Sequence, residues 1–169
     1  MHYGVARAGN QRRSDDCHVA TAHPGQPVGV VELTLHPGQE AFVADNIDSI
    51  ANASVEPTWV PLAVYAGEEL VGFVMYGQHP PDTGDWWVIR LMIAREHQGK
   101  GYGRAAMEAV IALMADRVGC EEIVTSVNPA NAVAFGLYTS LGFQPTGEIE
   151  DDEPLLRLRL ADRRSDQDP

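Results

Sequence analysis

The seven residues from His97 to Gly103 (HQGKGYG) are the part of this sequence whose types and spacing are best suited to bind a ligand. They follow an apolar stretch, 86–93, that is typical of a strand, and they precede a stretch, 104–118, whose apolar residues recur at helical spacing. Glycine has no Cβ atom, so the backbone can approach a ligand closely, and a helix start supplies unpaired N–H groups and a partial positive charge. This arrangement predicts a site for a phosphate or a pyrophosphate.

Two other phosphate-binding sequences do not match this turn. The P-loop pattern G-x-x-x-x-G-K-[ST] does not occur in the chain. The dinucleotide pattern G-x-G-x-x-G differs in spacing from the order found here, which is Gln98-x-x-Gly101-x-Gly103. A glycine-rich turn without a ligand is the remaining alternative.

A second segment, residues 128–143 (NPANAVAFGLYTSLGF), has the pattern of a capped helix. Asn131 stands where an N-cap would satisfy free amides, and apolar residues recur at helical spacing over 134–141. Gly142 can adopt the left-handed conformation that ends a helix. The segment therefore predicts a short helix that is followed by a new strand.

In this order, about 30 residues apart, the two segments resemble motifs A and B of the GCN5-related N-acetyltransferases (GNAT). Motif A is Q/R-x-x-G-x-G/A, which cradles the pyrophosphate of acetyl-CoA, and motif B is N-x-x-A-x-x-x-Y-x-x-x-G-F. The resemblance covers roughly residues 30–160. It implies acetyl-CoA as the cofactor and the transfer of its acetyl group to an amine as the reaction.

The resemblance also implies which residues hold the cofactor. Backbone N–H groups at the end of the strand 86–93 would face the pantetheine arm and polarise the thioester carbonyl. Lys100 or Arg104 would add a positive charge at a phosphate, or would be solvated surface cations. Asn131 would hydrogen-bond the arm, or would be only a helix cap. The expected cofactor-binding residues are Leu91, Met92, Ile93, Gln98, Gly99, Lys100, Gly101, Tyr102, Gly103, Arg104 and Asn131.

By the same resemblance, Tyr138 would be the general acid that protonates the leaving thiolate, since a phenol with a pKa near 10 is protonated at neutral pH. A core aromatic residue is the alternative. Many family members have a glutamate on the strand before the turn, but the strand 86–93 has no carboxylate. Glu56 is therefore the candidate for the base, with a solvated loop glutamate as its alternative. Removal of the proton by a water chain, or binding of the small fraction of free amine, would make a dedicated base unnecessary.

Aromatic side chains are expected to form the acceptor side of the site, because they suit an alkylammonium chain through cation–π contact. Core packing is the alternative for all of them, and for Trp87 it has at least equal weight. Arg90 is unusual on so apolar a strand, and it could pair with Glu56 or another acid, or bind a substrate carboxylate. The expected acceptor-side residues are Glu56, Trp59, Tyr76, Trp86, Trp87 and Arg90.

Four further strings resemble the bacterial diamine and polyamine acetyltransferases of the spermine/spermidine type: 43–51, 61–65, 71–77 and 89–93. The resemblance implies direct transfer to a polyamine in a ternary complex, and a dimer, since many relatives form one. An amino-bearing antibiotic, an amino acid or a protein N-terminus are alternative acceptors. A sensor that binds acetyl-CoA without turnover and a surface-interaction module are the alternatives outside enzymes.

Composition agrees with a single soluble domain: 169 residues, 44% hydrophobic and 21% charged. No apolar run is long enough to span a membrane, and the two cysteines, Cys17 and Cys120, are too few for a disulfide or metal framework. We therefore predict a cytoplasmic protein without a metal. The net charge of −12 argues against nucleic acid as a partner. It would attract cationic amines, or would only keep the protein soluble.

The order of elements, β-α-β-β-β-α-β-α-β-β, together with the resemblance, predicts an α/β fold. Its mixed, mostly antiparallel sheet would have six to seven strands and helices on both faces. Residues 1–28 are expected to be a flexible arm, 29–161 the domain and 162–169 a flexible tail. The loop 51–61 has room for a short second helix. Strands are expected at 30–34, 62–65, 70–76, 86–93, 121–127, 143–149 and 155–160, and helices near 42–50, at 104–118 and at 131–141.

Overall fold

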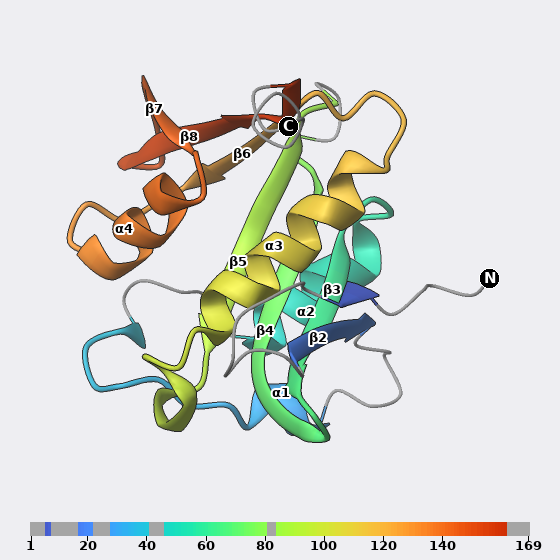
Figure 1. The fold of residues 1–169 in the computed structure, drawn as a ribbon, viewed down its shortest axis with the longest axis vertical. Coiled ribbons are helices and arrows are strands. Elements are labelled where there is room, and N and C mark those ends of the chain that lie inside the picture. The colour runs from blue at the N-terminus through green and yellow to red at the C-terminus, as the bar shows by residue number, and fades with distance from the viewer. Residues whose placement is uncertain (1–5, 8–16, 22–27, 41–45, 81–83, 162–169) are drawn as a thin grey trace, which may run out of the picture.

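A computed structural model describes residues 6–7, 17–21, 28–40, 46–80 and 84–161 of the chain. They form one mixed sheet with helices on both faces, as predicted (Figure 1). The strand order is β1-β2-β3-β4-β5-β6-β8-β7, and neighbours are antiparallel except for β5 and β6. The strands are β1 (Ala6–Arg7), β2 (Cys17–Thr21), β3 (Val60–Ala66), β4 (Glu69–Gln78), β5 (Trp86–Ile93), β6 (Glu122–Ser126), β7 (Gln144–Glu150) and β8 (Glu153–Arg159). The helices are α1 (Val28–Val31), α2 (Asn46–Val55), the 3₁₀ turn η2 (Arg95–His97), α3 (Tyr102–Ala115) and α4 (Ala132–Ser140).

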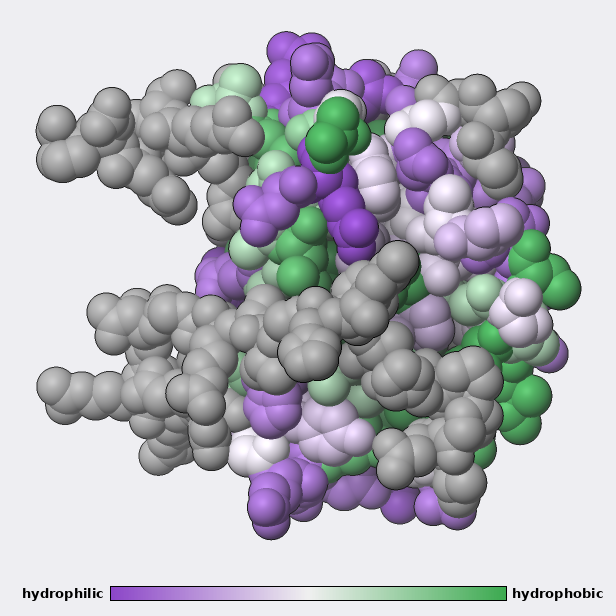
Figure 2. Space-filling model, turned by 90° about the vertical axis from the view of Figure 1, so that its right-hand side faces the viewer, coloured by the Kyte–Doolittle hydropathy of each residue, from purple (hydrophilic) through white to green (hydrophobic). Residues whose placement is uncertain are grey.

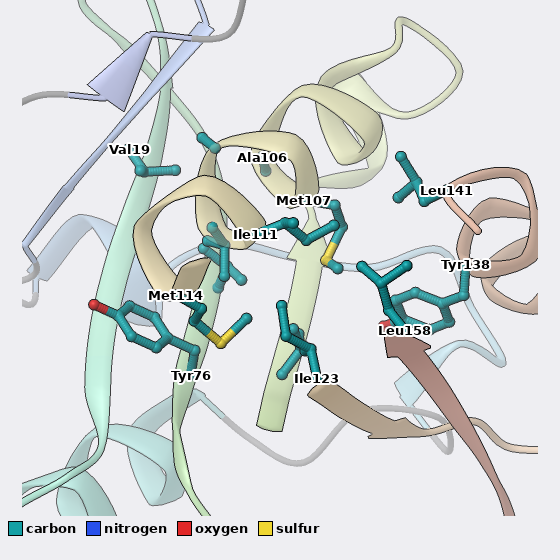
Figure 3. Close-up of a cluster of buried hydrophobic side chains, with 14 of the residues drawn as sticks. Val19, Tyr76, Ala106, Met107, Ile111, Met114, Ile123, Tyr138, Leu141 and Leu158 are labelled. Atoms are coloured by element: carbon teal, nitrogen blue, oxygen red, sulfur yellow. The ribbon is translucent and has the colours of Figure 1, made fainter. Parts of the chain in front are cut away.

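Helix α3 covers one face of the sheet over the larger hydrophobic core. Its inward residues Met107, Val110, Ile111 and Met114 are at most 3% exposed, which confirms the stripe that their i, i+3, i+4, i+7 spacing predicts. Figure 3 shows α3 side chains meeting those of β2, β4, β6, β8 and α4 in this core. The rigid packing of α3 therefore fixes where its N-terminus lies.

The opposite face of the sheet is covered by α1 and α2. Phe73 and Met75 of β4 are fully buried there, against Val30 of α1 and Ile50 of α2. The two cores together show that the side chains of β4 are packed on both faces, as the continuous apolar run of this strand predicts.

The first long strand lies earlier in the chain than predicted. Residues 30–34 were predicted to be this strand, but Val30 lies in the short helix α1. The strand is β2, which pairs with β3 along its length and lies within the predicted arm, 1–28. Cys17 and Val19 are 4% and 3% exposed in the core beneath α3, and this alternation is the signal that the prediction missed.

Helix α2 extends five residues into the predicted loop 51–61. It is held by Asn46, whose side-chain amide donates to the carbonyl of Val30 (2.9 Å) and to the sulfur of Met92 (3.1 Å). Two helices, α1 and α2, thus lie between β2 and β3 where one was predicted. The start predicted for this helix falls on residues 41–45, outside the described part.

The part of the surface that is not grey in Figure 2 is mixed in character. Hydrophilic side chains gather mainly at the top and bottom of this view, and hydrophobic ones lie at the right-hand edge and in the centre. The predicted flexible tail, 162–169, lies outside the described residues. Within the described part, no helix is both long and apolar enough to cross a bilayer.

Strands β5 and β6 are parallel and pair only at their first ends. The ladder consists of the pairs that Trp86 and Trp87 make with Ile123 and Val124, while the other edge of β6 pairs with β8 along its whole length. Where the two strands part, the hydroxyl of Thr125 donates to the carbonyl of Val88 (3.0 Å). The resulting gap between β5 and β6 is visible in Figure 1, where β6, β7, β8 and α4 fan away from β5.

Val19→Asp tests the place of β2 in the core. The change should lower the free energy of unfolding by about 3–5 kcal/mol, because it leaves an unpaired charge beneath α3. The matched control is Val118→Asp, at a fully exposed valine, which should change it by about 0.5 kcal/mol or less. Urea denaturation measures both, and equal losses would contradict the assignment of β2 to the core.

Candidate active site

Strand β5 presents backbone groups to the gap. Beyond a bulge in the β4–β5 ladder, the N–H of Ala94 donates to the carbonyl of Val71 (2.9 Å). Hydrogen-bonded and non-hydrogen-bonded pairs alternate in an antiparallel ladder. The N–H of Met92 therefore points to β4, whereas those of Leu91 and Ile93 point away from it toward the gap.

The turn after β5 leads into α3 with its first amides available. Gly99 and Gly101 have φ angles of 73° and 89°, a left-handed region that favours glycine. Gly101 is the N-cap residue of α3, and no side chain caps this helix. The N–H of Ala105 bonds to the carbonyl of Gly101 (3.1 Å), so the amides before it have no helical partner. This is the arrangement that binds phosphate groups.

A cavity of about 400 Å³ extends along β5, the turn and the start of α3. Nine of the eleven predicted cofactor residues line it, and Lys100 and Arg104 do not. Leu35, Gln39, His97, Val133, Ala134 and Leu137 complete the lining. The predicted residues at the cavity are Leu91, Met92, Ile93, Gln98, Gly99, Gly101, Tyr102, Gly103 and Asn131.

The two predicted cations lie outside this cavity. Lys100 is exposed, and no described residue forms an ion pair with it. The guanidinium of Arg104 donates to the hydroxyl of Ser140 and lies 3.7 Å from Glu108. The structure thus gives Arg104 a bracing contact between α3 and the end of α4.

Gln98 braces the turn through its side chain. Its amide nitrogen donates to the carbonyl of Ile93 (3.0 Å) and to the side-chain oxygen of Gln39 (2.9 Å), and Gln39 donates back (3.2 Å). Gln39 lies in the segment after α1, which nothing in the sequence connected with this site. The pair closes one side of the cavity.

Tyr138 lies at a smaller cavity of about 70 Å³ between β5 and β6. Its side chain is 6% exposed in the core beneath α3 and also borders this cavity, as Figure 3 shows for its core contacts. Burial raises the pKa of Tyr138 to about 12, although a hydrogen bond with Thr125 lowers it and the charge of Glu153 raises it. Tyr138 is therefore a neutral proton donor throughout the neutral range.

Asn131 lies where the two cavities meet. Its side-chain oxygen accepts from the N–H of Ala134 (3.1 Å), so it is the N-cap of α4. Asn131, Ala134 and Leu91 border both cavities. The cap that was one alternative for Asn131 is present, and the predicted hydrogen bond to the cofactor's arm stays a prediction for a residue that also lines the cavity.

Arg90 and Glu56 are not brought together. Arg90 borders the smaller cavity, and one of its Nη atoms donates to the carbonyl of Ile89 (2.8 Å) while its buried Nε has no partner in the described part. Burial lowers the pKa of Arg90, and the charge of Glu153 raises it. Glu56 follows α2 and lines neither cavity, and its recorded contacts are backbone bonds to Asn52 and Trp59.

The aromatic residues predicted on the acceptor side divide between the two faces of the sheet. Trp59 and Trp87 meet the ring of His79 edge-on, with centroids 5.8 and 5.4 Å away. Tyr76 and Trp86 lie on the α3 face, and the hydroxyl of Tyr76 accepts from Arg117 (2.8 Å). Trp86 and Trp87 must separate because consecutive strand residues point to opposite faces.

Several residues at or near the site were missed from the sequence. Gln39 and Leu35 reach the larger cavity only because the chain folds, and His79 lies beyond the predicted strand 70–76. Thr125 and Glu153 reach the gap because β6 and β8 pair beside it. Nothing distinguishes Glu153 in sequence from the acids that precede it at 150–152. Among the described residues, no cluster of potential metal ligands occurs.

Comparison with known proteins defines the class. The model of the acetyltransferase (GNAT) family matches residues 41–143, more than half of the chain. The chain therefore belongs to the acetyltransferase (GNAT) family and is an acetyl-CoA-dependent N-acetyltransferase.

Three proteins illustrate the likeness. Spermine/spermidine N(1)-acetyltransferase of Bacillus subtilis (strain 168) is 29% identical over 126 residues, covering 72% of this chain and 83% of that protein. Peptidyl-lysine N-acetyltransferase YjaB of Escherichia coli (strain K12) is 33% identical over 108 residues, covering 60% and 63%. The crystal structure of aminoglycoside acetyltransferase AAC(6')-Ib in complex with coenzyme A and kanamycin has a TM-score of 0.74 at 15% identity, covering 90% and 99%.

Gly101→Ala tests the turn. A Cβ atom would meet nothing within 4 Å, so the expected loss of about 1–2 kcal/mol in the free energy of unfolding arises from the left-handed φ alone. The matched control is Gly136→Ala within α4, where a Cβ atom also has open space. This change should stabilise the protein by about 0.5–1 kcal/mol, since alanine is the better helix former. Thermal denaturation compares them, and a neutral Gly101→Ala would contradict the strained turn.

Proposed function

We propose that the protein transfers the acetyl group of acetyl-CoA to a primary amine of a diamine or polyamine, directly and within a ternary complex. The observation that carries the proposal is the meeting of two cavities across the β5–β6 gap. The larger one offers backbone donors and the amides of a helix start, and the smaller one offers a buried phenol. A thioester and an amine that enter from the two sides would meet beside Leu91.

The larger cavity suits the cofactor. The amides at the start of α3 would hold the pyrophosphate, and the N–H groups of Leu91 and Ile93 would bind the arm and the thioester carbonyl. Met92 would contribute only side-chain contact, because its N–H points to β4. Lys100 and Arg104 would contribute positive charge near the phosphates from outside the cavity.

Tyr138 would donate the proton that the leaving thiolate needs. A phenol with a pKa of about 12 is a weak acid, but burial also raises the pKa of thiols in this protein, to about 11 at Cys17 and Cys120. A thiolate released in the same buried gap would gain basicity for the same reason. Proton transfer from Tyr138 would then be close to balanced.

The charge of the chain favours a cationic acceptor. The net charge of −12 attracts polycations. Trp59, His79 and Trp87 form an aromatic group on the sheet face opposite α3, but they line neither of the two cavities. The named Bacillus relative acts on spermine and spermidine. Tyr76 has no part in this group, and a homodimer stays a prediction.

An acceptor panel tests the proposal. Thiol release from acetyl-CoA would be followed with spermidine, spermine, putrescine, lysine, a lysine peptide and kanamycin. We expect the highest kcat/KM with a polyamine. A higher kcat/KM with the peptide or with kanamycin would show that the acceptor is not a polyamine. Thermal stabilisation by acetyl-CoA without any turnover would indicate a sensor instead of an enzyme.

Tyr138→Phe tests the acid. It should lower kcat by about 10²–10⁴-fold with the affinity for acetyl-CoA unchanged, because it removes only the donated proton. Tyr76→Phe is the matched control: the same hydroxyl is lost from a residue that is 2% exposed and bonded to Arg117 away from the gap. Its activity should stay at the wild-type value. Similar kcat values for the two variants would remove Tyr138 from the acid role.

A further inference from the structure

Among the described residues, Glu153 is the one that brings a carboxylate to the smaller cavity. This residue opens β8 and is half-buried, and it borders the cavity together with Arg90 and Tyr138. The negative charge of Glu153 raises the pKa of Arg90 and of Tyr138, so the carboxylate interacts electrostatically with both side chains. The sequence offered no reason to select it from the acidic turn before β8.

One oxygen of Glu153 is held in place and the other is available. The hydroxyl of Ser126, on the neighbouring strand β6, donates to Oε2 at 2.6 Å. Oε1 accepts no hydrogen bond from any described residue. Ser126 pairs with Leu155 at the end of the β6–β8 ladder, and beyond it the N–H of Val127 donates to the carbonyl of Pro154, the residue after Glu153 (3.2 Å). The carboxylate is thus oriented by the protein and retains the capacity to accept a proton from a ligand.

Arg90 does not form an ion pair with this carboxylate. None of the ion pairs within 4.0 Å among the described residues includes Arg90 or Glu153. The guanidinium donates to the carbonyl of Ile89 instead. The two opposite charges therefore face the same cavity without direct contact, which leaves room for a cationic group beside Glu153.

We propose that Glu153 is the catalytic carboxylate that binds the acceptor ammonium and accepts its proton, and that Ser126 positions it. This assignment rests on the proposed acetyl transfer to an amine. It replaces Glu56, which lines neither cavity. A positioned carboxylate supplies the base that the strand before the turn lacks.

The proton and bond changes balance with these two residues. The ammonium passes one proton to Glu153, and the neutral amine attacks the thioester carbon to form the C–N bond. The C–S bond then breaks and the thiolate takes the proton of Tyr138. The second proton of the nitrogen restores Tyr138, and Glu153 releases its proton to solvent. One proton is released for each acetyl group transferred.

Glu153→Gln tests the assignment. With the best amine of the panel, kcat/KM at pH 7 should fall by about 10²–10³-fold, while the affinity for acetyl-CoA, measured by calorimetry, is unchanged. The defect should shrink as pH rises from 7 to 10, because a growing share of the amine arrives neutral. The charged or titratable groups that face Glu153 are Arg90 from β5, Tyr138 from α4 and its ladder partner Glu150 from β7.

Glu150→Gln is the matched control, since it removes the same charge from the paired strand but does not border the cavity. It should leave kcat/KM within about threefold of the wild type. A Glu153→Gln defect that is the same at every pH, or one no larger than that of Glu150→Gln, would overturn the assignment.

Ser126→Ala provides a second variant if Glu153→Gln does not fold. It should lower kcat more than it raises KM, because the carboxylate remains but loses its orientation, and the loss should again shrink at high pH. Unchanged kinetics would overturn the positioning of Glu153. If the wild type turns over no amine, the proposed function itself fails. If the wild type acetylates an amine and both variants are equally active, only the role of Glu153 is overturned.

Discussion

The shortness of the ladder between β5 and β6 is the constraint on which the rest of the site depends. Two residue pairs hold these parallel strands together, whereas β8 pairs with the other edge of β6 along its whole length. Backbone N–H and C=O groups that lose a strand partner need another one. Thr125 satisfies the carbonyl of Val88, and the amides of Leu91 and Ile93 are left facing a cavity. A substrate that completes this edge is therefore bound by the sheet itself.

Helix α3 connects this edge to the core. Its buried stripe packs against both halves of the sheet, so its uncapped N-terminus is held at the end of β5 instead of moving with the turn. The left-handed glycines let the chain reverse directly from η2 into the helix. Stability and binding are thus linked, because the packing of Met107 and Met114 also positions the amides that would hold a phosphate.

The pleat of β5 decides which side chains take part in chemistry. Trp86 packs beneath α3, whereas Trp87 lies on the other face beside His79. Arg90 and Tyr138 share the gap with Glu153, which comes from a strand distant in sequence. The phenol of Tyr138 and the carboxylate of Glu153 thus approach the gap from different elements, α4 and β8. This arrangement suits a reaction in which one proton leaves the amine and another reaches the thiol.

Local pattern was sufficient to determine the turn, the α3 stripe and the Asn131 cap, which follow from glycine conformation, helical periodicity and capping. The resemblance to the family, and not these short-range rules, supplied nine of the lining residues of the larger cavity. Only the tertiary structure decided that β2 is the first long strand, that Tyr76 lies in the core and that Glu153, and not Glu56, lines the smaller cavity. Each of these depends on which strands become neighbours, and strand pairing joins residues far apart in the chain that carry no local signal of their partner.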